Sequence, residues 1–143
     1  MNEDSIRLLR EVNAGCKNAT NSFDQVIEFV KEQDLKDLIE EYRKEHQLVG
    51  DIAHQLLNND GEDEKDPPTM AKAMMWFTTE VKMMMSDDDS RVAELLIDGC
   101  HMGVKSLGKY LRQYENADQK ERALAGRLMN IEMELYKKLM VFL

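Results

Sequence analysis

The chain has 143 residues, with 28 acidic against 19 basic side chains and a net charge of −9. This balance, and the lack of a clustered Lys/Arg face, argue against binding to nucleic acid or to an anionic membrane surface. No apolar run approaches the roughly 20 residues of a membrane span, and the N-terminal residues MNEDSIRLLR lack the apolar segment of a signal peptide. Two cysteines far apart in such a chain are typical of reduced thiols, so we expect a cytoplasmic protein.

The chain is predicted to form one helical domain over residues 1–143. Only seven Gly and two Pro interrupt it, and apolar residues recur at the spacings of a helix face. A first helix is predicted from a cap at Asp4 or Ser5 to about Lys31. Its apolar face consists of Leu9, Val12, Cys16, Ala19, Phe23, Val26, Ile27 and Val30.

A second helix, about residues 35–58, follows a tight break at Gln33 and Asp34, and so short a connection predicts antiparallel neighbours. Residues 58–68, NNDGEDEKDPP, combine turn residues, a charge run and both prolines, and predict a solvated acidic linker. The apolar face of the second helix contains Leu38, Tyr42, Val49, Ile52, Leu56 and Leu57.

A shorter crossover helix is predicted over residues 69–86. Met75, Trp76 and Met83 lie away from its inward face. So many methionines fit an adaptable binding surface, but we favour a helix that lies over the bundle with Trp76 at a contact between protomers. The inward face contains Met70, Met74, Phe77, Val81 and Met84.

Two further helices are predicted over about residues 90–114 and from the break at 115–118 to the C-terminus. The crossover helix makes the second and fourth helices parallel, so the predicted fold is an all-α, ferritin-like four-helix bundle with a short crossover helix between the second and third long helices. The two apolar faces contain Val92, Leu96, Cys100, Val104, Leu107 and Leu111, and Leu124, Leu128, Ile131, Leu135, Leu139 and Phe142.

Bundles of this type often hold two metal ions between Glu side chains and Glu-x-x-His pairs. Asp51–His54 and Asp98–His101 have a similar spacing. Helical projection nevertheless places Asp51, His54 and Asp98 on polar faces and His101 at a boundary. These pairs are therefore expected to be solvated.

Glu45, His46 and Glu132 project toward the interior, and His46, His101 and Glu132 lie at similar heights along the bundle. Glu45, His46, Glu132 and His101 are therefore the candidate ligands for iron or manganese, although we expect no cofactor. A buried Glu–His pair without metal is the alternative that we prefer.

The first helix argues against a standard di-iron centre, because its inward positions carry no carboxylate. Arg43 also stands three residues before His46, where the motif requires Glu. The ligand set of such a centre is thus incomplete.

Four segments carry a family resemblance: LLREVNAGCKNATNSF, DLKDLIEEYRKEHQLVGDI, AKAMMWFTTEVK and MNIEMELYKKL. Together they resemble the ferritin-like superfamily, and most of all an uncharacterised bacterial branch of small single-bundle proteins. The last segment is similar to the final helix of rubrerythrin-like bundles. The resemblance implies the fold and transfers activity poorly.

Two functions are open at this point. The first is a metal-free, non-catalytic module that binds another protein or forms homo-oligomers, in dimers or larger assemblies, through the off-face Met75, Trp76 and Met83 and the apolar end MVFL. The second is a metal-binding or redox bundle that uses Glu45, His46 and Glu132 with His101 or a thiol. A phosphate loop, a nucleophile elbow and a CxxC pair are all missing from the sequence, so other enzyme classes have no support.

Overall fold

A computed structural model describes residues 1–64 and 66–143; Lys65, in the predicted linker, lies outside the described residues. The described chain is all-α and contains no strand, which confirms the all-α part of the prediction. The helices are α1 (Glu3–Val26), η1 (Ile27–Phe29), α2 (Gln33–Asn59), α3 (Pro68–Lys82), α4 (Asp89–Gln113), α5 (Gln119–Leu139) and η2 (Met140–Phe142).

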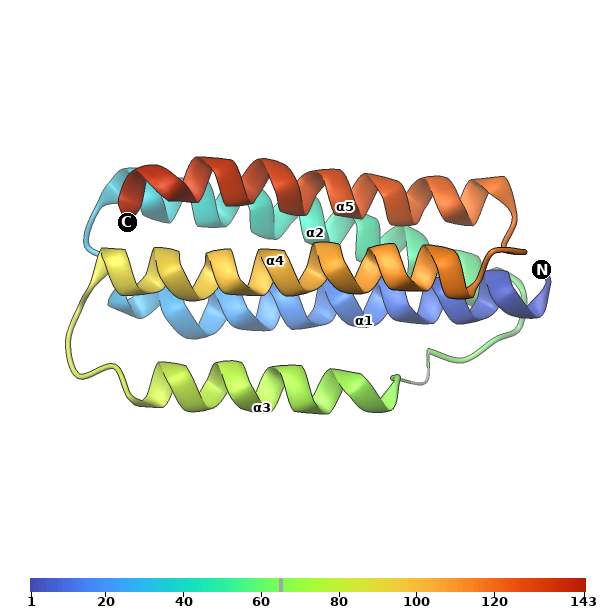
Figure 1. Ribbon diagram of the computed structural model, residues 1–143, viewed down its shortest axis with the longest axis horizontal. Coiled ribbons are helices and arrows are strands. Elements are labelled where there is room, and N and C mark those ends of the chain that lie inside the picture. Colours follow the sequence, from blue (N-terminus) through green and yellow to red (C-terminus); the bar gives the residue numbers. More distant parts are fainter. Residues whose placement is uncertain (65) are drawn as a thin grey trace.

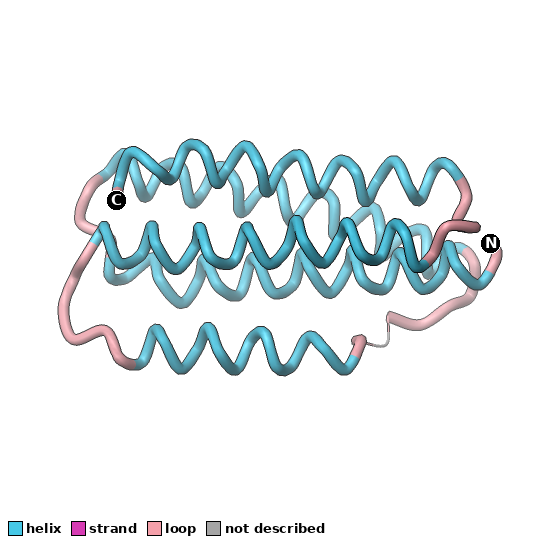
Figure 2. Tube along the Cα trace, in the orientation of Figure 1, coloured by secondary structure: helices cyan, strands magenta, loops and turns pink. Residues whose placement is uncertain are grey.

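Four long helices form a bundle, and α3 lies along its outside (Figure 1). The main packing pairs are α1 with α2 and α4 with α5, whereas α3 contacts α1 and, less extensively, α4. Because α3 returns the chain along the length of the bundle, α2 and α4 run in the same direction. Connections between helices lie at the two ends of the bundle (Figure 2). None of the described helices combines the length and apolarity needed to cross a lipid bilayer.

The core contains many of the predicted apolar side chains, but in α2 Leu35 and Ile39 are buried, whereas the predicted Leu38, Ile52 and Leu56 are only half-buried. Burial of each large aliphatic side chain contributes about 1.5–3 kcal/mol, so these side chains provide the main drive for packing the helices. The completely buried side chains in the centre include Leu8, Leu9, Val12, Val26, Leu35, Val49, Leu57, Val92, Leu95 and Leu139.

The start of α1 differs from the prediction. Asn2 is the N-cap, and its side-chain oxygen accepts a hydrogen bond of 2.8 Å from the backbone N–H of Ser5. The predicted cap at Asp4 or Ser5 was wrong because both side chains accept hydrogen bonds from the connection between α4 and α5. Asp4 accepts from the N–H of Asn116 at 3.0 Å, and buried Ser5 accepts from the N–H of Asp118 at 2.8 Å.

The end of α1 also differs, because the α-helix stops at Val26 rather than near Lys31. A turn of 3-10 helix follows, and Val30 is extended. The carboxylate of Asp89 accepts hydrogen bonds from the backbone N–H groups of Lys31 and Glu32 at 2.7 and 3.0 Å. A residue from the start of α4 therefore fixes the turn between α1 and α2.

The crossover helix begins at Pro68, with Pro67 as its N-cap, and ends at Lys82, so it is shorter than the range 69–86. Residues 83–88 then connect it to α4, which Asp88 caps through a 3.1 Å hydrogen bond from the N–H of Arg91. Phe77 and Val81 of α3 are buried against the bundle.

Candidate functional site

The central feature of the core is a contact between two polar side chains that are 86 positions apart in the sequence. His46 of α2 is completely buried, and Glu132 of α5 is 8% exposed. The Nε2 atom of His46 forms a hydrogen bond with Oε1 of Glu132. The ring of Phe23 packs edge-on against the imidazole at a centroid distance of 5.3 Å. The structure thus brings together two of the four predicted ligands.

The protonation of His46 follows from its partners. Its Nδ1 atom lies 2.7 Å from the carbonyl oxygen of Tyr42, and because a carbonyl only accepts, Nδ1 carries a proton. Burial lowers the pKa of His46. The hydrogen bond and negative charge of Glu132, together with the Tyr42 carbonyl, raise the pKa by more than burial lowers it, so the net shift is upward. The geometry therefore favours an imidazolium that donates from both nitrogens.

Two cysteine thiols lie near the same carboxylate. Cys100 of α4 and Cys16 of α1 are each 3% exposed, and the Cys100 thiol hydrogen-bonds to Glu132. Burial and the negative charge of Glu132 raise the pKa of both thiols. Both are therefore held as neutral thiols, which are poor nucleophiles.

The other two predicted ligands lie elsewhere. Glu45 is half-buried and influences His46 through its charge. His101 is exposed and packs against the ring of Tyr136 at a centroid distance of 4.4 Å. Since successive residues of a helix differ in direction by about 100°, the inward position of Cys100 turns His101 toward the surface.

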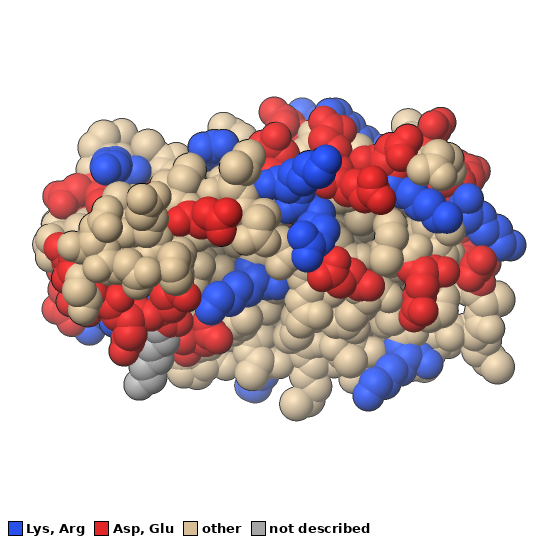
Figure 3. Space-filling view, turned by 180° about the vertical axis from the view of Figure 1, so that it is seen from behind, with Lys and Arg blue, Asp and Glu red and all other residues tan. Residues whose placement is uncertain are grey.

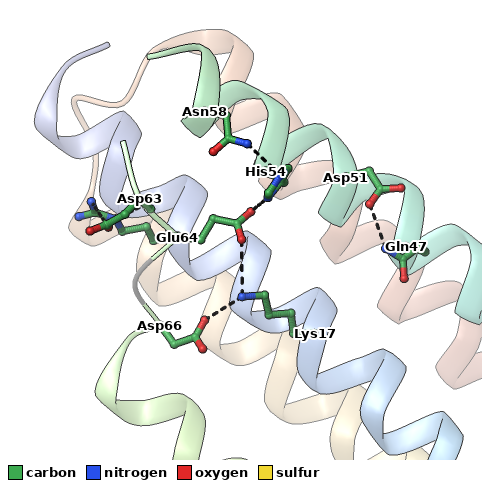
Figure 4. A network of polar contacts seen from close by, with 9 residues as sticks. Lys17, Gln47, Asp51, His54, Asn58, Asp63, Glu64 and Asp66 are labelled. Carbon is green, nitrogen blue, oxygen red and sulfur yellow. Dashed lines mark hydrogen bonds and ion pairs between the residues drawn. The ribbon is translucent and has the colours of Figure 1, made fainter. Parts of the chain in front are cut away.

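The Asp-x-x-His pairs lie at the surface. Asp51 accepts a hydrogen bond from Gln47 at 2.9 Å, and exposed His54 contacts Glu64 and Asn58 (Figure 4). In the same network Glu64 and Asp66 approach the ammonium group of Lys17. These contacts tie the acidic connection after α2 to α1 and α2.

The described residues contain no group of three or more His, Cys, Asp and Glu side chains arranged to hold a metal ion. Both nitrogens of His46 already have partners, so a metal would have to replace Glu132 or the Tyr42 carbonyl at the imidazole. The residues present therefore do not form the ligand set of a di-iron centre.

Beside the polar pair lies a cavity of about 180 Å³, which the sequence reasoning missed. It lies between α3 on one side and α1, α4 and α5 on the other, and Cys100 and Glu132 belong to its lining. Small residues where α1 and α4 face α3, such as Ala19, Gly99 and Gly103, leave this space open. Their recurrence opposite the large methionines of the crossover helix was the signal available in the sequence.

Residues 4–113 match a protein family described as a domain of unknown function, DUF2383. The match covers well over half of the chain. The chain belongs to the DUF2383 family. His46 and Cys100 lie within the residues that match DUF2383, whereas Glu132 lies beyond them. A comparison with curated proteins gives no match.

Proposed function

We propose that the protein is a ferritin-like bundle that acts without catalysis, by binding a second copy of itself through the outward face of α3. This face consists of Met75 and Trp76 of α3 and of Met83, the C-cap residue directly after the helix, which are 70%, 37% and 70% exposed. The parallel course of α2 and α4 supports the ferritin-like topology (Figure 1). In this proposal the buried His46–Glu132 pair is what remains of a metal site, and the pair now stabilises the core.

The observation that carries the proposal is that α3 is apolar on two opposite sides. Phe77 and Val81 pack inward, whereas the outward face spans about 100° of the helix circumference. A helix on the surface of a monomer needs only one apolar side, and a second one favours a partner.

The charge of α3 points to a second copy as that partner. Two chains that each carry −9 repel one another, so they associate best where acidic groups are scarce. Lys72 and Lys82 of α3 are exposed, and its one acidic residue, Glu80, pairs with Arg91 at 2.8 Å. Seen from behind, the lower edge of the molecule, where α3 runs, shows mostly uncharged and basic side chains (Figure 3).

The spacing of the methionines suits a two-fold axis. Met75 and Met83 lie eight residues, or about 12 Å, apart on the same side of α3, with exposed Thr79 midway between them. Antiparallel packing of two α3 helices around Thr79 would set Met75 of each copy against Met83 of the other. Such an interface is self-complementary and closes as a dimer.

Sedimentation equilibrium at micromolar concentrations tests the proposal. The wild type is expected to be dimeric, and the double variant Met75→Glu/Met83→Glu is expected to be monomeric with unchanged helicity by circular dichroism. Leu48→Glu is the matched control, because Leu48 is 52% exposed on α2, and it is expected to remain dimeric. A monomeric wild type would contradict the proposal. Dissociation caused instead by Val141→Glu, at the exposed C-terminal end, would place the interface elsewhere.

The second function, a metal-binding or redox bundle, stays a prediction of the sequence. What favours it is the meeting of an imidazole, a carboxylate and a thiol in the core at His46, Glu132 and Cys100. Metal analysis of protein purified from cells grown with added iron or manganese decides between the two functions. A content far below one ion per chain would exclude the second function.

A further inference from the structure

We propose that the cavity beneath α3 is a binding site for a small apolar amine, with the carboxylate of Glu132 as the acceptor for its ammonium group. This site is independent of the outward face of α3, because it lies on the opposite, inward side of that helix.

The walls of the cavity fit an apolar body. Met70, Met74 and Phe77 of α3 line one side, and Leu96 and Leu128 line the other. Unbranched methionine side chains adapt to guests of different shape. A cavity of about 150 Å³ with apolar walls is known to bind benzene, so about 180 Å³ accommodates an aromatic ring with a short arm.

The charged side chains of the cavity are all carboxylates. Its lining contains two carboxylates, Glu132 and Glu11, and no Lys or Arg. An ionised carboxylate accepts about four hydrogen bonds, and the described residues supply Glu132 with those of His46 and Cys100. The side-chain oxygen of Asn18, which also lines the cavity, is buried without a partner among the described residues. A guest that donates several hydrogen bonds would satisfy these groups, whereas an anionic guest would meet two carboxylates and no cationic side chain in the lining.

Positive charge on the guest is favoured by Glu11 at the same cavity. Burial raises the pKa of Glu11, although a hydrogen bond from Tyr110 opposes the shift. A cation close by would offset this cost of burial for the carboxylate. The net charge of −9 also attracts cations toward the molecule. An ammonium group on an apolar body therefore matches the cavity better than a neutral or anionic head group.

Titration of the full chain with benzylamine, benzyl alcohol and benzoate, followed by calorimetry and amide NMR, tests the proposal. Benzylamine is expected to bind most tightly and to shift the amides of Gly99 and Gly103, and benzoate is expected not to bind. Glu132→Gln is expected to weaken benzylamine about tenfold or more, since a hydrogen bond to a charged group is lost. Equal binding of benzoate or benzyl alcohol, or shifts confined to other surfaces, would overturn the assignment.

If Glu132→Gln folds poorly, a second pair of variants tests the binding site without changing Glu132. A β-carbon added at Gly99 would meet no atom within 4 Å, and Gly99 lines the cavity, so Gly99→Leu is expected to place its side chain in the cavity. Gly126→Leu on α5 is the matched control, because Gly126 has equally open space and does not line the cavity. Gly99→Leu is expected to abolish benzylamine binding and Gly126→Leu to preserve it. Retained binding in a folded Gly99→Leu variant would refute the site, whatever the oligomeric state.

Discussion

Glu132 of α5 lies directly against the backbone of Gly103 on α4, where an added β-carbon would stand 3.1 Å from Oε2. The carboxylate cannot easily move away, because His46 and Cys100 hold it. Close approach of α4 to this buried pair therefore depends on the missing side chain at Gly103.

Gly103→Ala is accordingly expected to lower the free energy of unfolding by about 1 kcal/mol or more, since overpacking outweighs the better helix propensity of alanine. Gly99→Ala, one turn earlier and in open space, is expected to raise it by up to about 1 kcal/mol. Urea denaturation of both variants measures the difference. Equal stabilisation by both substitutions would show that Glu132 yields without cost.

Removal of one partner of the buried pair should destabilise the folded protein more than removal of both partners. Glu132→Leu leaves the His46 imidazole buried without its acceptor and is expected to cost about 3 kcal/mol of stability. The double variant His46→Leu/Glu132→Leu is expected to recover much of that loss, because two apolar side chains of similar size pack together. A double-mutant cycle from thermal or urea unfolding gives the coupling. Simple additivity of the two single changes would contradict the pairing.

The raised pKa of His46 predicts a pH dependence of stability. The unfolded chain loses the His46 proton near pH 6.5, whereas the folded chain retains it to higher pH. The folded state thus binds more protons between these two pKa values, so the free energy of unfolding should fall as pH rises above about 6.5. Urea titrations from pH 6 to 8 measure this slope, and His46→Gln should flatten it. The exposed-histidine variant His101→Gln serves as control and should keep the wild-type slope.

The position of α3 predicts that it opens before the rest of the bundle. It packs mainly against α1, with few contacts to α4, and a cavity lies beneath it. Local opening requires less free energy where fewer contacts are lost. Amides of α3 are expected to exchange hydrogen faster than those around Leu95 in α4, as measured by native-state exchange. Equal protection throughout both helices would mean that α3 unfolds only with the whole domain.

The helices and their inward faces were predictable because each depends on spacing within one segment of sequence. The ends of α1 were not, because they depend on distant partners: Asp89 fixes the turn after η1, and the connection before α5 engages Asp4 and Ser5. Such contacts join residues more than 50 positions apart, so the pattern of residues within one segment of sequence does not predict them.

The meeting of His46 and Glu132 was predictable from two things, their inward projection and their similar height along antiparallel helices. The exposed position of His101 was less clear, since a boundary residue turns inward or outward according to how closely its neighbours pack. The cavity escaped prediction for a related reason. Its existence depends on how far α3 stands from α1 and α4, and that distance follows from three-dimensional packing rather than from any single helix face.

The sulfur atoms of the molecule are divided by the fold into two classes of chemical reactivity. Cys16 and Cys100 are buried as protonated thiols, which shields them from oxidants. Met75, Met83 and Met85, by contrast, are 70%, 70% and 97% exposed, and their thioethers are open to oxidation. Conversion to sulfoxide makes such side chains polar. An oxidant would therefore change the outer surface of α3 and of the connection after it, while the thiols of the core stayed reduced.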